Sequence, residues 1–386
     1  MINNHFKNNL IIRFFVLAIF FLLLAEVPSV SAQQLSASFA AGNGQYNSET
    51  FWLQDQPVLL NDRYLSFMKS GRQVSGFLTY GLAADYSSIA LLERGVSKPG
   101  VLQLTTAGDT LNQFDIDGLE GNDPSLALYP QGDGTVMLRK NIAGFSQFDV
   151  FGHEKYFVSN SSRSQGGEVI SEVATTPDGR VTLLYNPKIM RDGKAGSAAR
   201  VLEASGENRS VFYNDERTIA SADIGTSGSA IALLTRKEGT NDQIVILDRF
   251  GRRLRKIETE EDLVDINLSD KGRYLTIWAR GRIQVYRTID GKRLGSTSSR
   301  TPVVWADYAP DDGVVVAIMG RHPEGSKKIG QPEIQAVHFG KREIVNDELD
   351  DTIGMSDKLP IRLVRSSRYH YRIEGINRPV NVSISF

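Results

Sequence analysis

The sequence predicts an all-β fold, a β-propeller of seven four-stranded blades, with six or eight blades as alternatives. Two observations predict it: turn motifs that recur with a period above 40 residues, and short apolar runs between those turns. A period in this range is typical of repeat architectures. Helical periodicity is missing beyond the first 32 residues, so we expect each repeat to consist of strands.

The first series of turns ends on a glycine and precedes an apolar run. Its members are Gly132-Asp133-Gly134, Pro177-Asp178-Gly179, Thr226-Ser227-Gly228, Asp270-Lys271-Gly272 and Asp311-Asp312-Gly313. Their last glycines are 45, 49, 44 and 41 residues apart. The runs that follow, such as VTLLY at residues 181–185, do not alternate between apolar and polar residues. Such runs indicate strands buried on both faces, as occurs when blades pack against one another.

A second series of turn glycines falls between the members of the first. Its members are Gly108, Gly152, Gly206, Gly251, Gly291 and Gly340. Around Gly251, IVILD precedes and RRLRKI follows, as expected of two antiparallel strands joined by a tight turn. Each period therefore holds four strands with tight turns after the first and the third, which makes one propeller blade.

One period resembles a unit of the WD-repeat or YVTN-type propellers. Residues 263–275 (LVDINLSDKGRYL) carry the likeness, together with residues 282–286 (RIQVY) and the turn at residues 290–292. The resemblance extends over six periods, within residues 74–347. The Trp-Asp dipeptide of the family is missing, and its Gly-His dipeptide is missing from the period at residues 263–292. The resemblance therefore implies the fold and assigns no site residues.

The two ends of the chain are expected to close the ring within one blade. Residues 359–363, 369–373 and 380–386 supply three strands, and an amino-terminal segment supplies the fourth, with residues 64–68 as the candidate. Such closure removes the free strand edges.

The carboxyl-terminal segment is also compatible with a second fold, a β-barrel. Residues 380–386 alternate strictly and end on Phe, which is typical of the last strand of outer-membrane β-barrels. Barrel strands are about 9 to 11 residues long and alternate throughout. The other runs of this chain are shorter and apolar on both faces, so the barrel is kept only as an alternative to the propeller.

The amino terminus predicts export. Lys7 and Arg13 accompany the apolar residues 14–25, and a small-x-small motif ends at Ala32. This arrangement is typical of a secretory signal cleaved before Gln33. We expect the protein in the periplasm, on the cell surface or outside the cell, with no membrane span after cleavage.

The chain thus divides into three segments. Residues 1–32 are the predicted signal peptide, residues 33–62 an amino-terminal extension or extra blade strands, and residues 63–386 the propeller. There is no cysteine in the sequence. Because disulfides cannot stabilise the exported protein, packing must do so.

Composition and motifs restrict the function. The 44 Lys and Arg residues balance 45 Asp and Glu residues, so no nucleic-acid partner is expected. No Gly-x-Ser-x-Gly, His-Glu-x-x-His or phosphate-loop motif occurs, so we assign no catalytic residue and expect no cofactor. The sequence predicts a monomeric, non-catalytic binding or scaffold module for a protein, peptide or glycan. The alternative is a lyase, hydrolase or quinone-dependent dehydrogenase with a site at the channel mouth.

The strand order places the connections on two rims of the disc. Tight turns after the first and third strands form the short-turn rim. Connections after the second strand and between blades form the long-connection rim, on which residues 186–199 and 320–333 are prominent. Since binding usually evolves on long loops, this rim is the predicted binding face. Its candidate residues for an anionic partner are Lys188, Arg191, Arg321, Lys327 and Lys328.

Acidic residues suggest two further sites. Four of them lie on first strands, share one side and are expected to face the central channel: Glu172, Asp223, Asp265 and Asp307. They either form a ring that holds a cation or ordered water, or each hydrogen-bonds a neighbouring blade. The other candidates are Asp115, Asp117 and Asp123, in a loop rich in oxygen ligands that lacks EF-hand spacing. That loop is either a metal site or a solvated turn.

Overall fold

The structure is a computed structural model. It describes residues 33–39, 50–54, 56–60, 64–95, 98–119, 126–140, 144–159, 172–191, 193–323, 325–356 and 359–386. The regular elements in these ranges are the strands β1 to β33. The described residues contain no helix with the length and apolar character needed to cross a membrane. The predicted signal peptide, residues 1–32, lies outside the described residues.

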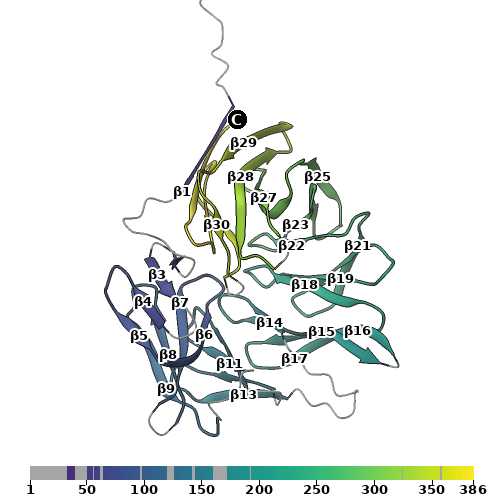
Figure 1. Cartoon of the computed structure of the whole chain (residues 1–386). Coiled ribbons are helices and arrows are strands. Elements are labelled where there is room, and N and C mark those ends of the chain that lie inside the picture. The colour runs from purple at the N-terminus through teal and green to yellow at the C-terminus, as the bar shows by residue number, and fades with distance from the viewer. Residues whose placement is uncertain are drawn as a thin grey trace, which may run out of the picture.

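Eight antiparallel sheets follow one another around a centre in chain order (Figure 1). We number them as blades 1 to 8. Blade 1 contains β2 (Thr50–Leu53), β3 (Gln56–Leu60), β4 (Tyr64–Phe67) and β5 (Gln73–Ser75). Blade 2 contains β6 (Phe77–Leu82), β7 (Ser88–Glu93), β8 (Gly100–Thr105) and β9 (Thr110–Asp115). Blade 3 contains β10 (Ala127–Pro130), β11 (Val136–Lys140), β12 (Gly144–Phe148) and β13 (Glu154–Ser159). Blade 4 contains β14 (Glu172–Thr175), β15 (Val181–Arg191), β16 (Lys194–Glu203) and β17 (Asn208–Asn214).

The remaining blades repeat this order. Blade 5 contains β18 (Thr218–Ile224), β19 (Ala230–Arg236), β20 (Gln243–Asp248) and β21 (Arg253–Glu258). Blade 6 contains β22 (Asp265–Leu268), β23 (Tyr274–Ala279), β24 (Arg282–Arg287) and β25 (Arg293–Ser298). Blade 7 contains β26 (Val303–Ala309), β27 (Val314–Arg321), β28 (Lys328–His338) and β29 (Glu343–Glu348), and β30 (Ile353–Gly354) also pairs with β28. Blade 8 contains β31 (Arg362–Ser367), β32 (His370–Glu374), β33 (Val380–Ser385) and β1 (Gln34–Phe39).

The propeller architecture is confirmed, and its eight described sheets lie at the upper end of the predicted range of blade numbers. Both turn series fall where the repeat places them. The first lies between the first and second strands of blades 3 to 7, and the second between the third and fourth strands of blades 2 to 7. In blade 3, Asp133 accepts a hydrogen bond from the Thr135 N–H at 2.9 Å, and Gly134 adopts a φ of 86°. The same place in blade 2 holds Tyr86, with a φ of 59°.

The ring closes in blade 8 between strands from both ends of the chain, as predicted. β1 pairs antiparallel with β33, from Gln34 opposite Ser385 to Phe39 opposite Val380, and Figure 1 shows the purple β1 beside the yellow carboxyl-terminal strands. The candidate for this amino-terminal strand, residues 64–68, was wrong, because Tyr64–Phe67 is β4 in blade 1. Both segments are short alternating runs, so local pattern cannot tell which of them meets β33. Residues 380–385, whose alternating pattern had left the fold open, thus form the third strand of blade 8.

The second strands supply the core between the blades. In β27 the first seven residues are all buried, and β19 is buried over its first six, which confirms burial on both faces. Fully burying one such aliphatic side chain contributes about 1.5 to 3 kcal/mol. Neighbouring first strands also approach closely: a Cβ at Gly81 in β6 would lie 1.9 Å from the Leu128 carbonyl oxygen in β10.

Polar contacts fasten blade 8 to its neighbours. The carboxylate of Asp312, in the first turn of blade 7, accepts hydrogen bonds from Arg365 at 2.8 and 3.0 Å and from the Tyr371 hydroxyl at 2.6 Å. On the other side, Tyr86 of blade 2 donates its hydroxyl proton to the Pro360 carbonyl, and the Arg362 guanidinium lies 4.3 Å from the Tyr86 ring centroid. Blade 2 therefore reaches blade 8 directly, although blade 1 stands between them in chain order.

Candidate functional site

The four predicted channel acids lie on innermost strands of four consecutive blades. Glu172 is in β14, Asp223 in β18, Asp265 in β22 and Asp307 in β26. They do not form one level ring. Glu172 and Asp265 pair with the fifth residue of the following strand, whereas Asp223 and Asp307 pair with the third. Two levels of acids, one deeper than the other, therefore line the channel wall.

Three of these acids make the same kind of hydrogen bond to the backbone. The carboxylates of Asp223, Asp265 and Asp307 each accept the N–H of the next residue, at 2.8, 2.8 and 2.7 Å. Asp223 also accepts the N–H of Leu268 in blade 6 at 2.5 Å. Hydrogen bonding to a neighbouring blade, one of the two arrangements considered for these acids, is therefore present at Asp223. Glu172 is exposed.

Burial weakens the acidity of the channel acids. It raises the pKa of Asp223 to about 6, with a further rise from the negative charge of Asp265. Burial also raises the pKa of Asp265, and it raises the pKa of Asp307 well above its usual range. Unpaired charge in such a place is costly, so these groups favour protons or cations.

A large cavity opens at the long-connection rim where blades 5, 6 and 7 meet the segment leading into blade 8. Its volume is about 1380 Å³. Asp223 and Asp265 border it toward the channel, and Trp278 and Trp305 contribute aromatic surface. The other charged residues that border it include Arg236, Lys237, Glu238, Asp242, Glu261, Asp262 and Arg280. A smaller cavity of about 490 Å³, bordered by Lys327, His322 and Met355, adjoins it.

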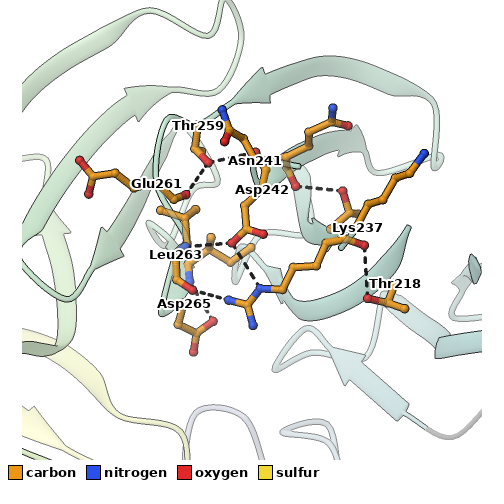
Figure 2. Close-up of polar contacts among 12 residues, drawn as sticks. Thr218, Lys237, Asn241, Asp242, Thr259, Glu261, Leu263 and Asp265 are labelled. Carbon is orange, nitrogen blue, oxygen red and sulfur yellow. Dashed lines mark hydrogen bonds and ion pairs between the residues drawn. The ribbon is translucent and has the colours of Figure 1, made fainter. Parts of the chain in front are cut away.

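A buried carboxylate organises one wall of the large cavity (Figure 2). Asp242 is 2% exposed and accepts hydrogen bonds from Arg236 at 3.3 Å and from the Leu263 N–H at 2.9 Å. Arg236 also donates to the Leu263 carbonyl, and the Thr259 hydroxyl donates to the Asp242 carbonyl at 2.9 Å. The connection between blades 5 and 6 is therefore held rigidly. Sequence reasoning missed Asp242, because a single Asp before an apolar strand is a common turn feature.

The basic candidates lie on two separate hairpins. Lys188 and Arg191 are in β15 of blade 4, whereas Arg321, Lys327 and Lys328 are in blade 7. Blades 5 and 6 lie between them in chain order, so the five residues do not share one patch. Lys188, Arg321, Lys327 and Lys328 are exposed, and only Lys327 borders a described cavity.

The prediction of long loops in blades 4 and 7 was wrong. β15 runs to Arg191 and β16 starts at Lys194, so most of residues 186–199 is an extended hairpin with a register shift between Asn186 and Ile189. Likewise β27 continues to Arg321 and β28 begins at Lys328. Residues 186–199 and 320–333 are rich in Gly, charged residues and Pro, and their sequence therefore reads as a loop although the backbone is extended.

The acid-rich loop of blade 2 shows an ion pair. Asp115 ends β9, and Asp117 pairs with Lys98. Asp123 lies outside the described residues. Among the residues that the structure describes, no group of three or more His, Asp or Glu side chains is placed to hold a metal ion.

The comparisons with known proteins place the fold. No protein-family model and no curated protein matches this chain. A solved complex of KlAtg21 with the coiled-coil of AgAtg16 contains a chain with a TM-score of 0.51 at 10% identity, covering 77% of this chain and 90% of that chain. The C-terminal WD40 domain of Sif2 has a TM-score of 0.48 at 10% identity, covering 86% and 89%. The chain thus has the β-propeller fold of WD-repeat domains.

Proposed function

We propose that the chain is an exported, non-catalytic propeller that binds a segment of a protein partner at the large cavity of the long-connection rim. The observation that carries this proposal is the size of the cavity. At about 1380 Å³ it exceeds the roughly 300 to 1000 Å³ of ordinary small-molecule pockets. A protein segment fits a cavity of this size, which blades 5, 6 and 7 and the segment leading into blade 8 surround.

The lining supports a protein partner. Trp278 and Trp305 supply aromatic surface among charged residues, and aromatic and Arg side chains are enriched at interface hot spots. Val264, at the edge of the cavity, is 43% exposed. The structural neighbour KlAtg21, solved in complex with a coiled-coil, supports the same class of function.

The proposal of export rests on the first 32 residues. Their basic, apolar and small-x-small sections match a secretory signal. Expression of the full chain in an exporting host, followed by amino-terminal sequencing, tests this part. A mature chain that begins at Gln33 supports it, and an intact Met1 terminus contradicts it.

Paired surface variants test the binding face. Val264→Arg places a charge at the cavity, and Ile289→Arg, on the short-turn rim of the same blade, is its matched control because Ile289 is 69% exposed. Proteins from the cell envelope and exterior are captured on each immobilised variant and identified by mass spectrometry. We expect a partner recovered by the parent chain and by Ile289→Arg but not by Val264→Arg. Loss through Ile289→Arg alone would place the interface on the other rim.

A further inference from the structure

A third, smaller cavity lies on the opposite rim of the propeller. Its volume is about 220 Å³, and it lies at the short-turn rim among blades 6, 7 and 8. The residues that border it include Tyr274, Asp307, Tyr308, Leu363 and Arg365. This volume is below the roughly 300 Å³ where small-molecule pockets begin. It therefore suits a single side chain or an organic ion of similar size.

Asp307 is the carboxylate of this cavity. One of its oxygens accepts the Tyr308 N–H at 2.7 Å, and the residue is partly buried. Among the described residues, no Lys, Arg or His forms an ion pair with it. Arg365, the basic residue of blade 8 at this cavity, is engaged by Asp312 at 2.8 and 3.0 Å. No described basic side chain of the protein therefore pairs with the Asp307 carboxylate.

Two tyrosines form an aromatic wall beside this carboxylate. The rings of Tyr274 and Tyr308 meet edge to face, with centroids 5.2 Å apart and an interplanar angle of 74°. Both rings are partly buried against the core. Aromatic faces attract cations, and more strongly when the cation is desolvated.

The charges at the edge are mixed. Asp270 and Asp311 border the cavity together with Lys271 and Arg273, which are exposed. These four charges offset one another. The negative charges of Asp223 and Asp270 reach Asp307, where they raise its pKa further. Asp307 therefore supplies the carboxyl group of the cavity interior, whereas the charges at the edge offset one another.

From these contacts we propose that the cavity binds an organic cation, a primary ammonium or guanidinium group, between Asp307 and the Tyr274–Tyr308 pair. A cation there neutralises an otherwise unpaired carboxylate and gains aromatic contact at the same time. The ligand is a free amine or a Lys or Arg side chain. This site lies on the rim opposite the proposed partner cavity and does not depend on it.

Calorimetric titration of the chain from Gln33 onward tests the site. The probes are butylammonium chloride, Nα-acetyl-lysine amide and the neutral Nα-acetyl-norleucine amide. We expect saturable binding of at least one cationic probe and none of the neutral one. Preference for butylammonium identifies a free amine, and preference for the lysine derivative a protein side chain. Equal binding of the neutral probe, or no cationic binding, overturns the proposal.

Two matched variants assign the binding to Asp307. Asp307→Asn keeps the shape and an acceptor oxygen, and should weaken cation binding at least about tenfold. Asp265→Asn is the control, because it has the same backbone contact but borders the large cavity instead. It should leave the affinity within about twofold. Thermal unfolding checks that Asp307→Asn is folded. An unchanged affinity in folded Asp307→Asn, or an equal loss in Asp265→Asn, overturns the assignment.

Discussion

Arg365 of blade 8 holds both carboxylate oxygens of Asp312 in blade 7, at 2.8 and 3.0 Å. The Asp312 side chain is only 1% exposed, and the Tyr371 hydroxyl donates to it as well. Bidentate Arg–carboxylate pairs are among the strong polar contacts in proteins. This contact joins the last internal blade to the blade built from both chain ends, and therefore fastens the closure of the ring.

Asp312→Asn should destabilise the folded chain by about 2 to 3 kcal/mol. The substitution removes the charge while leaving the Arg365 guanidinium beside a neutral partner. Urea unfolding followed by tryptophan fluorescence measures the change. Asp290→Asn is the control, because its pair with Arg287 is on the surface and should matter little. Equal midpoints for the Asp312→Asn and parent chains would contradict a role in closure.

The same carboxylate predicts loss of stability in acid. Hydrogen bonds from Arg365 lower the pKa of Asp312 to about 2, against about 3.9 in an unfolded chain. A lowered folded-state pKa contributes stability that is complete above about pH 4 and is lost as the pH falls toward 2. Unfolding free energies at pH 5, 4 and 3 should therefore fall more steeply for the parent chain than for Asp312→Asn. Parallel curves would show that other carboxylates cause the loss.

Asp223 predicts the opposite dependence on pH. Burial raises its pKa to about 6, so the folded chain binds a proton between about pH 4 and 6 that the unfolded chain does not. Stability from this group is complete below about pH 4 and is lost as the pH rises through 6. We expect a loss of roughly 1 to 2 kcal/mol across this range, since partial exposure screens the charge.

Asp223→Asn tests this dependence by the difference between two pH values. The amide keeps only one acceptor oxygen for the Leu268 and Ile224 N–H groups, so absolute stability is also expected to fall. The informative quantity is the change in unfolding free energy between pH 4.5 and pH 7. It should be smaller in Asp223→Asn than in the parent chain. A change of the same size would assign the proton to another group.

Tyr86→Phe should cost about 1 to 2 kcal/mol, because it leaves the Pro360 carbonyl without its donor. The ring stays, so its contact with Arg362 at 4.3 Å is retained. Thermal unfolding measures the effect. Tyr86→Ala should cost more than Tyr86→Phe, since a fully buried ring is lost as well. If both variants were as stable as the parent chain, the bridge from blade 2 to blade 8 would not support the ring.

Gly81→Ala should destabilise the chain by about 3 kcal/mol, because its Cβ would lie 1.9 Å from the Leu128 carbonyl oxygen. The backbones of blades 2 and 3 would have to separate. Gly330→Ala in β28 is the control, since its Cβ would meet nothing nearer than 3.8 Å. Urea midpoints of the two variants should differ clearly. Similar midpoints would show that the inner strands can shift without cost.

The repeat could be read directly from the sequence. Turn residues such as Asp133 and Gly134 act locally, because a side-chain acceptor and a positive φ are needed wherever a tight turn occurs. Burial of β27 on both faces was likewise visible as an apolar run. In blade 2, where Tyr86 replaces the turn glycine, the same turn forms without this signal.

Local pattern by itself thus determined the strands, their tight turns and the closure of the ring by strands from both chain ends. Tertiary structure alone decided which amino-terminal segment closes it, that residues 186–199 form a hairpin, and that Asp312 meets Arg365 across 53 residues of chain. The reason is physical. Turn and strand preferences act between residues that are near neighbours in the sequence. Contacts between blades and the walls of the channel are formed by residues that lie far apart in the sequence, so no short stretch of sequence contains them.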